Sequence, residues 1–149
     1  MTGFAWTVRV RTEAKRTVTV HARNHVFSIG NPLSFSVTDD QPCALELMLG
    51  AFAADLTATF RFLASSQHIQ LDAVEFSASC TLNNPLMYVG VIGESGHPGI
   101  DRIEGTLYVA ADADEDALAD LWVETLRRSP LYNTLHGAVE LSLRLQTTA

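Results

Sequence analysis

Residues 42–55 read PCALELMLGAFAAD, and this stretch decides the fold that the sequence predicts. An acidic pair at Asp39-Asp40 and the proline at position 42 are typical of the start of a helix. We therefore predict a helix from about Cys43 to Ser65. Apolar residues lie nearly all round this helix, so we expect it in a core, covered by a sheet or by a second chain.

Extended segments are predicted before this helix. Residues 4–11 and 16–23 alternate valine with polar residues on either side of the sequence Thr-Glu-Ala-Lys, which predicts a β-hairpin. Residues 25–36 are predicted to be further extended chain, interrupted by a turn at Gly30-Asn31-Pro32.

Strands are also predicted after the helix, where short β-prone or alternating segments occur. They lie at residues 74–82, 86–92, 103–110 and 139–145. A glycine-rich loop at 93–99 separates the second of them from the third. Strands, a long helix, more strands, a second helix and a last strand indicate a single α+β domain over residues 1–149.

The second helix is predicted to begin in the acidic segment 112–116 and to be amphipathic. Its basic end at Arg127-Arg128 suits the helix dipole. Because Pro130 disfavours helical geometry at the residue before it, the helix should end or kink at Ser129. One side of the helix is formed by Leu118, Leu121, Trp122, Thr125 and Leu126.

Composition narrows the functional classes. The chain is 47% hydrophobic and 18% charged, so it can bury a sizeable core. A formal net charge of −7 disfavours nucleic acid as a partner. The N-terminus has no basic region followed by an apolar stretch, and the longest apolar run, 47–54, is short for a membrane span. We expect a cytoplasmic protein with no membrane association.

Two segments resemble the OsmC/Ohr family, the osmotically inducible and organic hydroperoxide resistance proteins. Residues 42–55 resemble the family's Pro-x-x-Glu-Leu-x-x-Ala-Ala helix, and LRRSPLYNTL at 126–135 resembles the end of its second helix, where Cys-Pro-Val is usual. The resemblance implies an intertwined homodimer with antiparallel sheets around long buried central helices. It also implies a peroxidatic cysteine on the first helix, activated by an arginine and a glutamate. A resolving cysteine is implied near the end of the second helix.

The sequence departs from this pattern at three linked positions. Asp55 stands where the resemblance places the peroxidatic cysteine, and Ser129 stands in place of the resolving cysteine. Leu45 replaces the activating glutamate, with Glu46 beside it, where we expect a structural ion pair with an arginine. Neither an aspartate nor a serine can pass through a thiol redox cycle, so ordinary hydroperoxide reductase activity is not expected.

The expected function is binding of a small, apolar molecule in a pocket at the dimer interface. Asp55 would contact the ligand, or would instead form a structural ion pair with an arginine across the dimer. Which arginine faces the site stays open among Arg9, Arg11, Arg16 and Arg23. The candidate pocket residues are Asp55, Ser129, Met48, Phe52, Thr59, Arg23 and His25, with Phe62 and the helix of Trp122 as further apolar lining.

The alternative function is a diverged, thiol-dependent hydroperoxide reductase that uses Cys43 or Cys80. Cys43 lies near the helix start, where the dipole favours a thiolate, and is the candidate reactive thiol. Cys80 falls on the apolar side of its strand and is expected to be inert. The five histidines show no metal-ligand spacing, and we expect neither a metal nor a cofactor.

Two further interpretations stay open. A hydrolase could use Ser129, Asp55 and a histidine, although the sequence has no Gly-x-Ser-x-Gly turn. A purely structural or protein-interaction role is compatible with the acidic composition but is not indicated by it.

Overall fold

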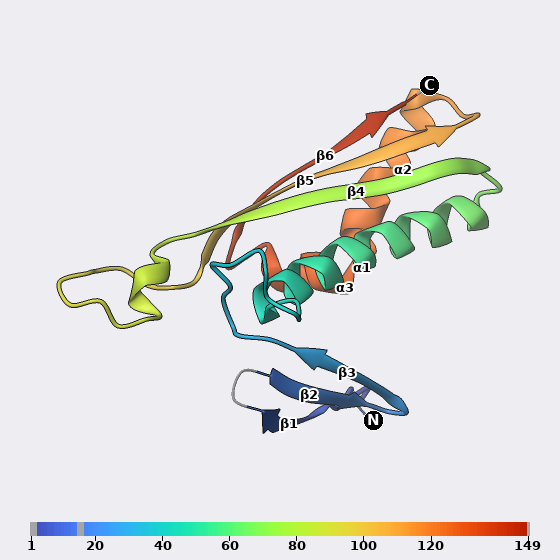
Figure 1. Ribbon diagram of the computed structural model, residues 1–149. Helices are drawn as coiled ribbons and strands as arrows, with labels where there is room; N and C mark the ends of the chain where they lie inside the picture. Colours follow the sequence, from blue (N-terminus) through green and yellow to red (C-terminus); the bar gives the residue numbers. More distant parts are fainter. Residues whose placement is uncertain (1–2, 15–16, 149) are drawn as a thin grey trace. The chain divides into compact units, whose positions relative to one another are not determined.

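The computed structural model describes residues 3–14 and 17–148, so Lys15 and Arg16 lie outside the described residues. The chain divides into two compact units, Met1–Met48 and Leu49–Ala149, with the long helix α1 running from the first into the second (Figure 1). Strands and helices together form an α+β fold, as predicted. The elements in order are β1 Arg9–Ala14, β2 Thr17–Ala22, β3 His25–Ile29, α1 Ala44–Ser66, β4 Leu71–Leu82, η1 Pro85–Met87, β5 Ile100–Ala111, α2 Glu115–Arg128, α3 Pro130–Leu135 and β6 Glu140–Thr147.

The first unit is a three-stranded antiparallel sheet followed by a loop. β1 pairs with β2 and β2 with β3, which confirms the predicted hairpin, although its first strand runs over Arg9–Ala14 rather than residues 4–11. Gly30 donates its N–H to the carbonyl of Pro42 at 2.9 Å, and Ala44 donates to Asn31 at 3.1 Å. Leu45 also donates to Pro32 at 3.3 Å, so the loop accepts two of the N–H groups that a helix leaves unpaired in its first turn.

A reciprocal pair of hydrogen bonds begins α1. The Cys43 N–H donates to Oε2 of Glu46 at 2.8 Å, and the Glu46 N–H donates to Sγ of Cys43 at 3.4 Å. This is the geometry of a capping box, with a thiol where serine or threonine is usual. The acidic pair Asp39-Asp40, which indicated a helix start in the sequence, does not cap α1, because Cys43 occupies the cap position. Glu46 caps the helix and forms no ion pair within the described part of the chain.

The second unit contains a mixed three-stranded sheet. β5 pairs with β4 antiparallel and with β6 parallel, so the expectation of purely antiparallel sheets is wrong for β6. The reason is that α2 and α3 separate β5 from β6, and parallel strands need such a crossover connection. Both α1 and α2 lie on one face of this sheet (Figure 1).

The strand predicted at 86–92 is also absent: this segment contains the end of a 3-10 helix followed by turns. Asn84 Oδ1 accepts the Leu86 N–H at 3.1 Å, and Pro85 supplies the fixed φ of the first turn. Gly90 has φ +72°, a conformation outside the β region. Local turn chemistry thus prevails over the β propensity of the valines.

The core of the second unit lies between α1, α2 and the sheet. α1 contributes a stripe, of which Phe52, Leu56 and Phe60 are fully buried. α2 contributes Leu118 and Leu121, as its apolar side predicted. The sheet contributes Ile103, Leu107 and Val109. Burying side chains of this size stabilises the fold by roughly 1.5–3 kcal/mol each.

Only one side of α1 is buried in the described chain, although apolar residues surround it. The side chain of Phe62 is 68% exposed. By length and composition α1 could also cross a membrane, and 28% of its most apolar window is buried. The core helix of a soluble protein meets the same criteria, so this is weak evidence for a membrane span.

The capping box generates a stability prediction. Replacing Cys43 by alanine removes the acceptor for the Glu46 N–H and should lower the free energy of unfolding by about 1 kcal/mol. Cys43→Ser keeps an acceptor and should stay closer to the unsubstituted protein. Urea denaturation followed by circular dichroism measures both. Equal losses for the two variants would mean that the sulfur contributes by packing alone.

Candidate functional site

Asp55 and Ser129, far apart in the sequence, form a direct hydrogen bond. Ser129 Oγ donates to Oδ2 of Asp55 at 2.5 Å, and the Leu131 N–H donates to the same oxygen at 3.0 Å. Ser129 Oγ in turn accepts the Tyr132 N–H at 3.0 Å. We call the hydrogen-bonded side chains of Asp55 and Ser129 the Asp55–Ser129 clasp. It joins α1 to the junction between α2 and α3.

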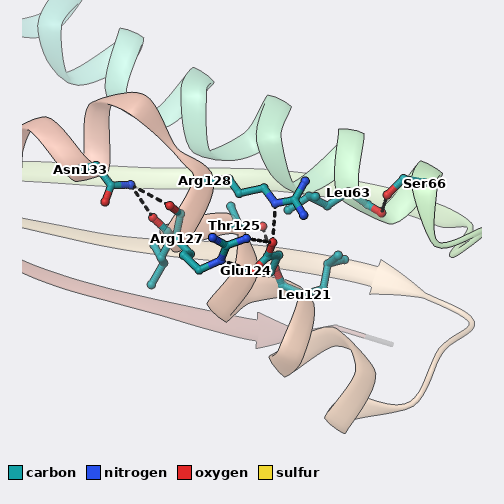
Figure 2. Close-up of polar contacts among 9 residues, drawn as sticks. Leu63, Ser66, Leu121, Glu124, Thr125, Arg127, Arg128 and Asn133 are labelled. Atoms are coloured by element: carbon teal, nitrogen blue, oxygen red, sulfur yellow. Dashed lines mark hydrogen bonds and ion pairs between the residues drawn. The ribbon is translucent and has the colours of Figure 1, made fainter.

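The local sequence explains the position of Ser129. Its backbone is extended, with φ −63° and ψ 120°, so α2 ends there as Pro130 predicted. The Ser129 N–H closes α2 by donating to the carbonyl of Thr125 at 2.9 Å, while its side chain caps α3. Asn133 fixes the same bend by donating to the carbonyls of Leu126 and Arg127, both at 3.1 Å (Figure 2). It also donates to the carbonyl of Ser129 at 2.7 Å.

Two hydrogen bonds from the same chain stabilise the Asp55 carboxylate. No basic side chain forms a salt bridge with Asp55 within residues 3–14 and 17–148. Its Oδ2 instead receives a hydroxyl and a backbone N–H from the first turn of α3, where the partial positive charge of the helix favours a carboxylate. Ser129 is fully buried, so its hydroxyl needs this partner.

An open depression lies farther along α1. It has a volume of ≈ 400 Å³ and is lined by Ala58, Thr59, Phe62 and Arg128. Three of these residues come from α1 and one from the end of α2. Thr59, predicted as a pocket residue, lines this depression, whereas Asp55 and Ser129 do not.

Arg128 belongs to a cluster of charged side chains on α2 (Figure 2). Arg127 and Arg128 both bind the carboxylate of Glu124, Arg127 through two hydrogen bonds of 2.6 Å. These hydrogen bonds lower the pKa of Glu124 from 4.5 to about 2. The cluster was missed in the sequence, although the i,i+3 and i,i+4 spacing that produces it is visible there.

The remaining predicted pocket residues lie elsewhere. Phe52 and Trp122 belong to the core of the second unit, Phe52 with no exposed surface. Met48 is half-buried on α1. Arg23 and His25 are exposed at the β2–β3 turn of the first unit, where Arg23 has φ +56°.

The arginine that was expected near the site stays unassigned. Arg9 and Arg11 are exposed on β1, and Arg16 lies outside the described residues. None of the salt bridges of the described chain involves Arg9, Arg11 or Arg23.

The two cysteines differ in environment. Cys43 is a free thiol, 4% exposed, held in the capping box of α1. Cys80 is half-buried in β4, on the side that packs against the core, as its alternation predicted. Within the described residues, no group of three or more metal-ligating side chains is found.

Fold and connectivity define a class: α+β proteins in which a long helix and a second helical segment cover one face of a mixed sheet. The chain belongs to the family of OsmC-like proteins, whose model matches residues 37–144. This confirms the resemblance noted in the sequence. No curated protein sequence matches the chain.

Several solved structures share the fold. An OsmC-like protein from Mycoplasma pneumoniae has a TM-score of 0.78 and 16% identity, covering 97% of this chain and 96% of that one. The organic hydroperoxide resistance protein OsmC of Legionella pneumophila has a TM-score of 0.67, 14% identity and coverage of 96% and 97%. OhrB of Bacillus subtilis, also an organic hydroperoxide resistance protein, has a TM-score of 0.62, 20% identity and coverage of 96% and 98%.

The Asp55–Ser129 clasp predicts that the stability losses caused by substitutions at the two positions are coupled. Asp55→Ala leaves the buried Ser129 hydroxyl without its acceptor and should cost about 1–3 kcal/mol. Ser129→Ala should cost about 1–2 kcal/mol, because it also removes the cap of α3. The double variant should lose less than the sum by about 1 kcal/mol.

Urea denaturation of the four proteins in this cycle measures the coupling. Asp120→Ala, at an exposed position of α2 with no hydrogen-bonding partner in the described chain, is the matched control and should change stability by less than about 0.5 kcal/mol. Strictly additive losses at Asp55 and Ser129 would contradict a direct interaction.

The low pKa of Glu124 generates a pH prediction. A carboxylate whose pKa is depressed in the folded state stabilises it above the unfolded pKa and loses this effect as pH falls through the folded value. The stability difference between the unsubstituted protein and Glu124→Gln should therefore be constant above pH 4.5 and disappear towards pH 2. Thermal unfolding across this range tests it, and a difference independent of pH would contradict the ion pairs.

Proposed function

We propose that this protein is an OsmC-like homodimer that lacks thiol-dependent hydroperoxide reductase activity and binds a small, uncharged apolar molecule. The observation that carries the proposal is the hydrogen bond from Ser129 to Asp55. The sequence resemblance assigns the family's two reactive thiols to these positions. Their side chains meet here as a hydroxyl and a carboxylate.

The chemistry of hydroperoxide reduction needs sulfur at both positions. A thiolate attacks the peroxide, the O–O bond breaks, an alcohol leaves and a sulfenic acid forms; a second thiol then attacks that sulfur and releases water as the disulfide forms. Carboxylate and hydroxyl oxygens have no corresponding oxidation cycle. The Asp55–Ser129 clasp preserves the contact between two helical segments while removing the redox chemistry.

The two remaining cysteines give little support to the alternative of a relocated reductase. At 4% exposure, Cys43 offers almost no surface to a peroxide, and its sulfur accepts the Glu46 N–H. Cys80 lies on the core side of β4. Reactive cysteines are typically accessible, which Cys43 is not, although it lies at the start of a helix.

The proposed ligand site is the depression beside Ala58, Thr59 and Phe62. Phe62 offers a largely exposed aromatic ring, which an apolar ligand would cover. Arg128 contributes its stem, because its charge is already paired with Glu124. This pairing favours an uncharged ligand over an anionic one.

A second copy of the chain would complete this site. Beyond the buried stripe, α1 exposes Ala51, Ala54, Ala58 and Phe62 along one side. Small side chains in such a row allow another helix to approach closely, and an exposed apolar row is typical of an interaction surface. Packing a second α1 there would bury Phe62 and enclose the depression.

The reductase alternative is tested by adding an organic hydroperoxide and a dithiol to the purified protein. We expect consumption no faster than in a protein-free control, with Cys43→Ser and Cys80→Ser behaving alike. Rapid turnover that one substitution abolishes would overturn the proposal and identify a relocated catalytic cysteine.

Ligand binding is tested with the uncharged fluorophore Nile red. Ala58→Trp should fill the depression and reduce binding at least about tenfold, because one bulky side chain excludes the ligand. Ala119→Trp, on the exposed side of α2, makes the same change elsewhere and should leave binding unaltered. Light scattering reports whether each variant is still dimeric. Equal binding by the two variants, or a monomeric unsubstituted protein, would contradict the proposed interface site.

A further inference from the structure

The face of the sheet that points away from α1 and α2 carries a regular polar array. One row across the strands is Ser77, Thr106 and Arg144, which are paired in register. The next is Ser79, Glu104 and Ser142. Residues two apart on a strand share a face, so the rows lie side by side.

These side chains surround a depression. Its volume is ≈ 330 Å³, and its lining includes both rows and Tyr108. Four of the six residues in the rows are serine or threonine, too short to fill the space between the longer Arg144, Glu104 and Tyr108. The floor is therefore rich in hydroxyl donors, with one arginine at its edge on β6.

Arg144 has no counter-ion. Its Nε donates to Oγ1 of Thr106 at 2.8 Å, and no carboxylate lies within ion-pair distance in the described ranges. Arg102 on the same sheet contrasts with it, since it binds Glu140 at 2.6 Å and Glu104 at 3.4 Å. Arg144 is exposed, so its unpaired guanidinium is accessible to a ligand from solvent.

Glu104 is the acidic residue that lines the depression, and its charge is partly neutralised by Arg102, which does not line it. Its pairing with Arg102 reduces its repulsion of an incoming anion. The Arg144 guanidinium, by contrast, keeps both terminal nitrogens available, since the single hydrogen bond to Thr106 uses Nε. Those nitrogens form the fork that binds an oxyanion through two hydrogen bonds.

We propose that this depression is a binding site for the oxyanion group of a small ligand, a phosphate or a carboxylate. Arg144 supplies the charge, and the hydroxyls of Ser77, Ser79 and Ser142 donate additional hydrogen bonds. Thr106 is 6% exposed, and it positions the guanidinium as the acceptor of its Nε–H. The site is independent of the apolar site proposed on α1.

The first test is an NMR titration of the full chain with inorganic phosphate and, separately, with acetate at low ionic strength. We expect saturable amide shifts centred on Ser77, Thr106 and Arg144. Saturation by phosphate assigns a phosphate group, and saturation by acetate alone assigns a carboxylate. No saturable shift with either anion would overturn the proposal.

Substitutions separate the site from general charge effects. Arg144→Gln should weaken binding at least about tenfold, and Arg144→Lys should restore part of it, because lysine keeps the charge without the fork. Arg61→Gln, at an exposed position of α1 with no ion pair in the described chain, removes the same charge and should have little effect. Equal weakening by Arg144→Gln and Arg61→Gln would overturn the proposal.

A second pair of variants keeps the test decisive if Arg144→Gln fails to fold. Glu104→Gln removes the acidic group from the depression and should tighten binding severalfold. Asp116→Asn, on the exposed surface of α2, changes net charge equally and should not. Unchanged binding in Glu104→Gln, or an identical gain in Asp116→Asn, would overturn the assignment.

Discussion

Burial of one stripe of α1 against the sheet is the constraint on which the rest of the second unit depends. Phe52, Leu56 and Phe60 have no exposed surface. Their spacing fixes the rotation of the helix about its own axis. Truncating any of them would cost about 2–5 kcal/mol, a large fraction of the stability of a small domain.

This rotation explains why the candidate site exists. Asp55 precedes the buried Leu56 and therefore lies at the margin of the stripe, half-buried rather than in solvent. A carboxylate in such a place needs donors, and the bend at Ser129-Pro130 supplies them. Packing of the apolar stripe of α1 sets the position of Asp55, and the hydrogen bonds of its carboxylate follow from that position.

The sequence predicted elements whose signals are local and strong. The bounds of α1, the hairpin of the first unit and the end of α2 at Ser129 were all accessible from periodicity, valine alternation and Pro130. Contacts between segments that are distant in the sequence could not be predicted from such local signals. The parallel pairing of β6 depends on a crossover, and α3 depends on a cap by Ser129 that a serine before proline does not by itself specify.

In the candidate site, too, the sequence predicted individual residues but not the contacts between them. Asp55 and Ser129 were identified separately as departures from a pattern, but their hydrogen bond depends on the packing of segments 74 residues apart. Phe52 was expected in a pocket because helical periodicity cannot distinguish a core-facing ring from a cavity-facing one. Cys43 was identified as a candidate reactive thiol from its place near the helix start, but its role as an acceptor in a capping box was not foreseen.

The shared hydrogen bond between Asp55 and Ser129 has an evolutionary consequence. Replacing Asp55 alone would leave the fully buried Ser129 hydroxyl without its acceptor, so the cost of that change depends on the residue at position 129. A substitution at position 55 is therefore not neutral while Ser129 is present. The two positions are therefore expected to change together rather than independently.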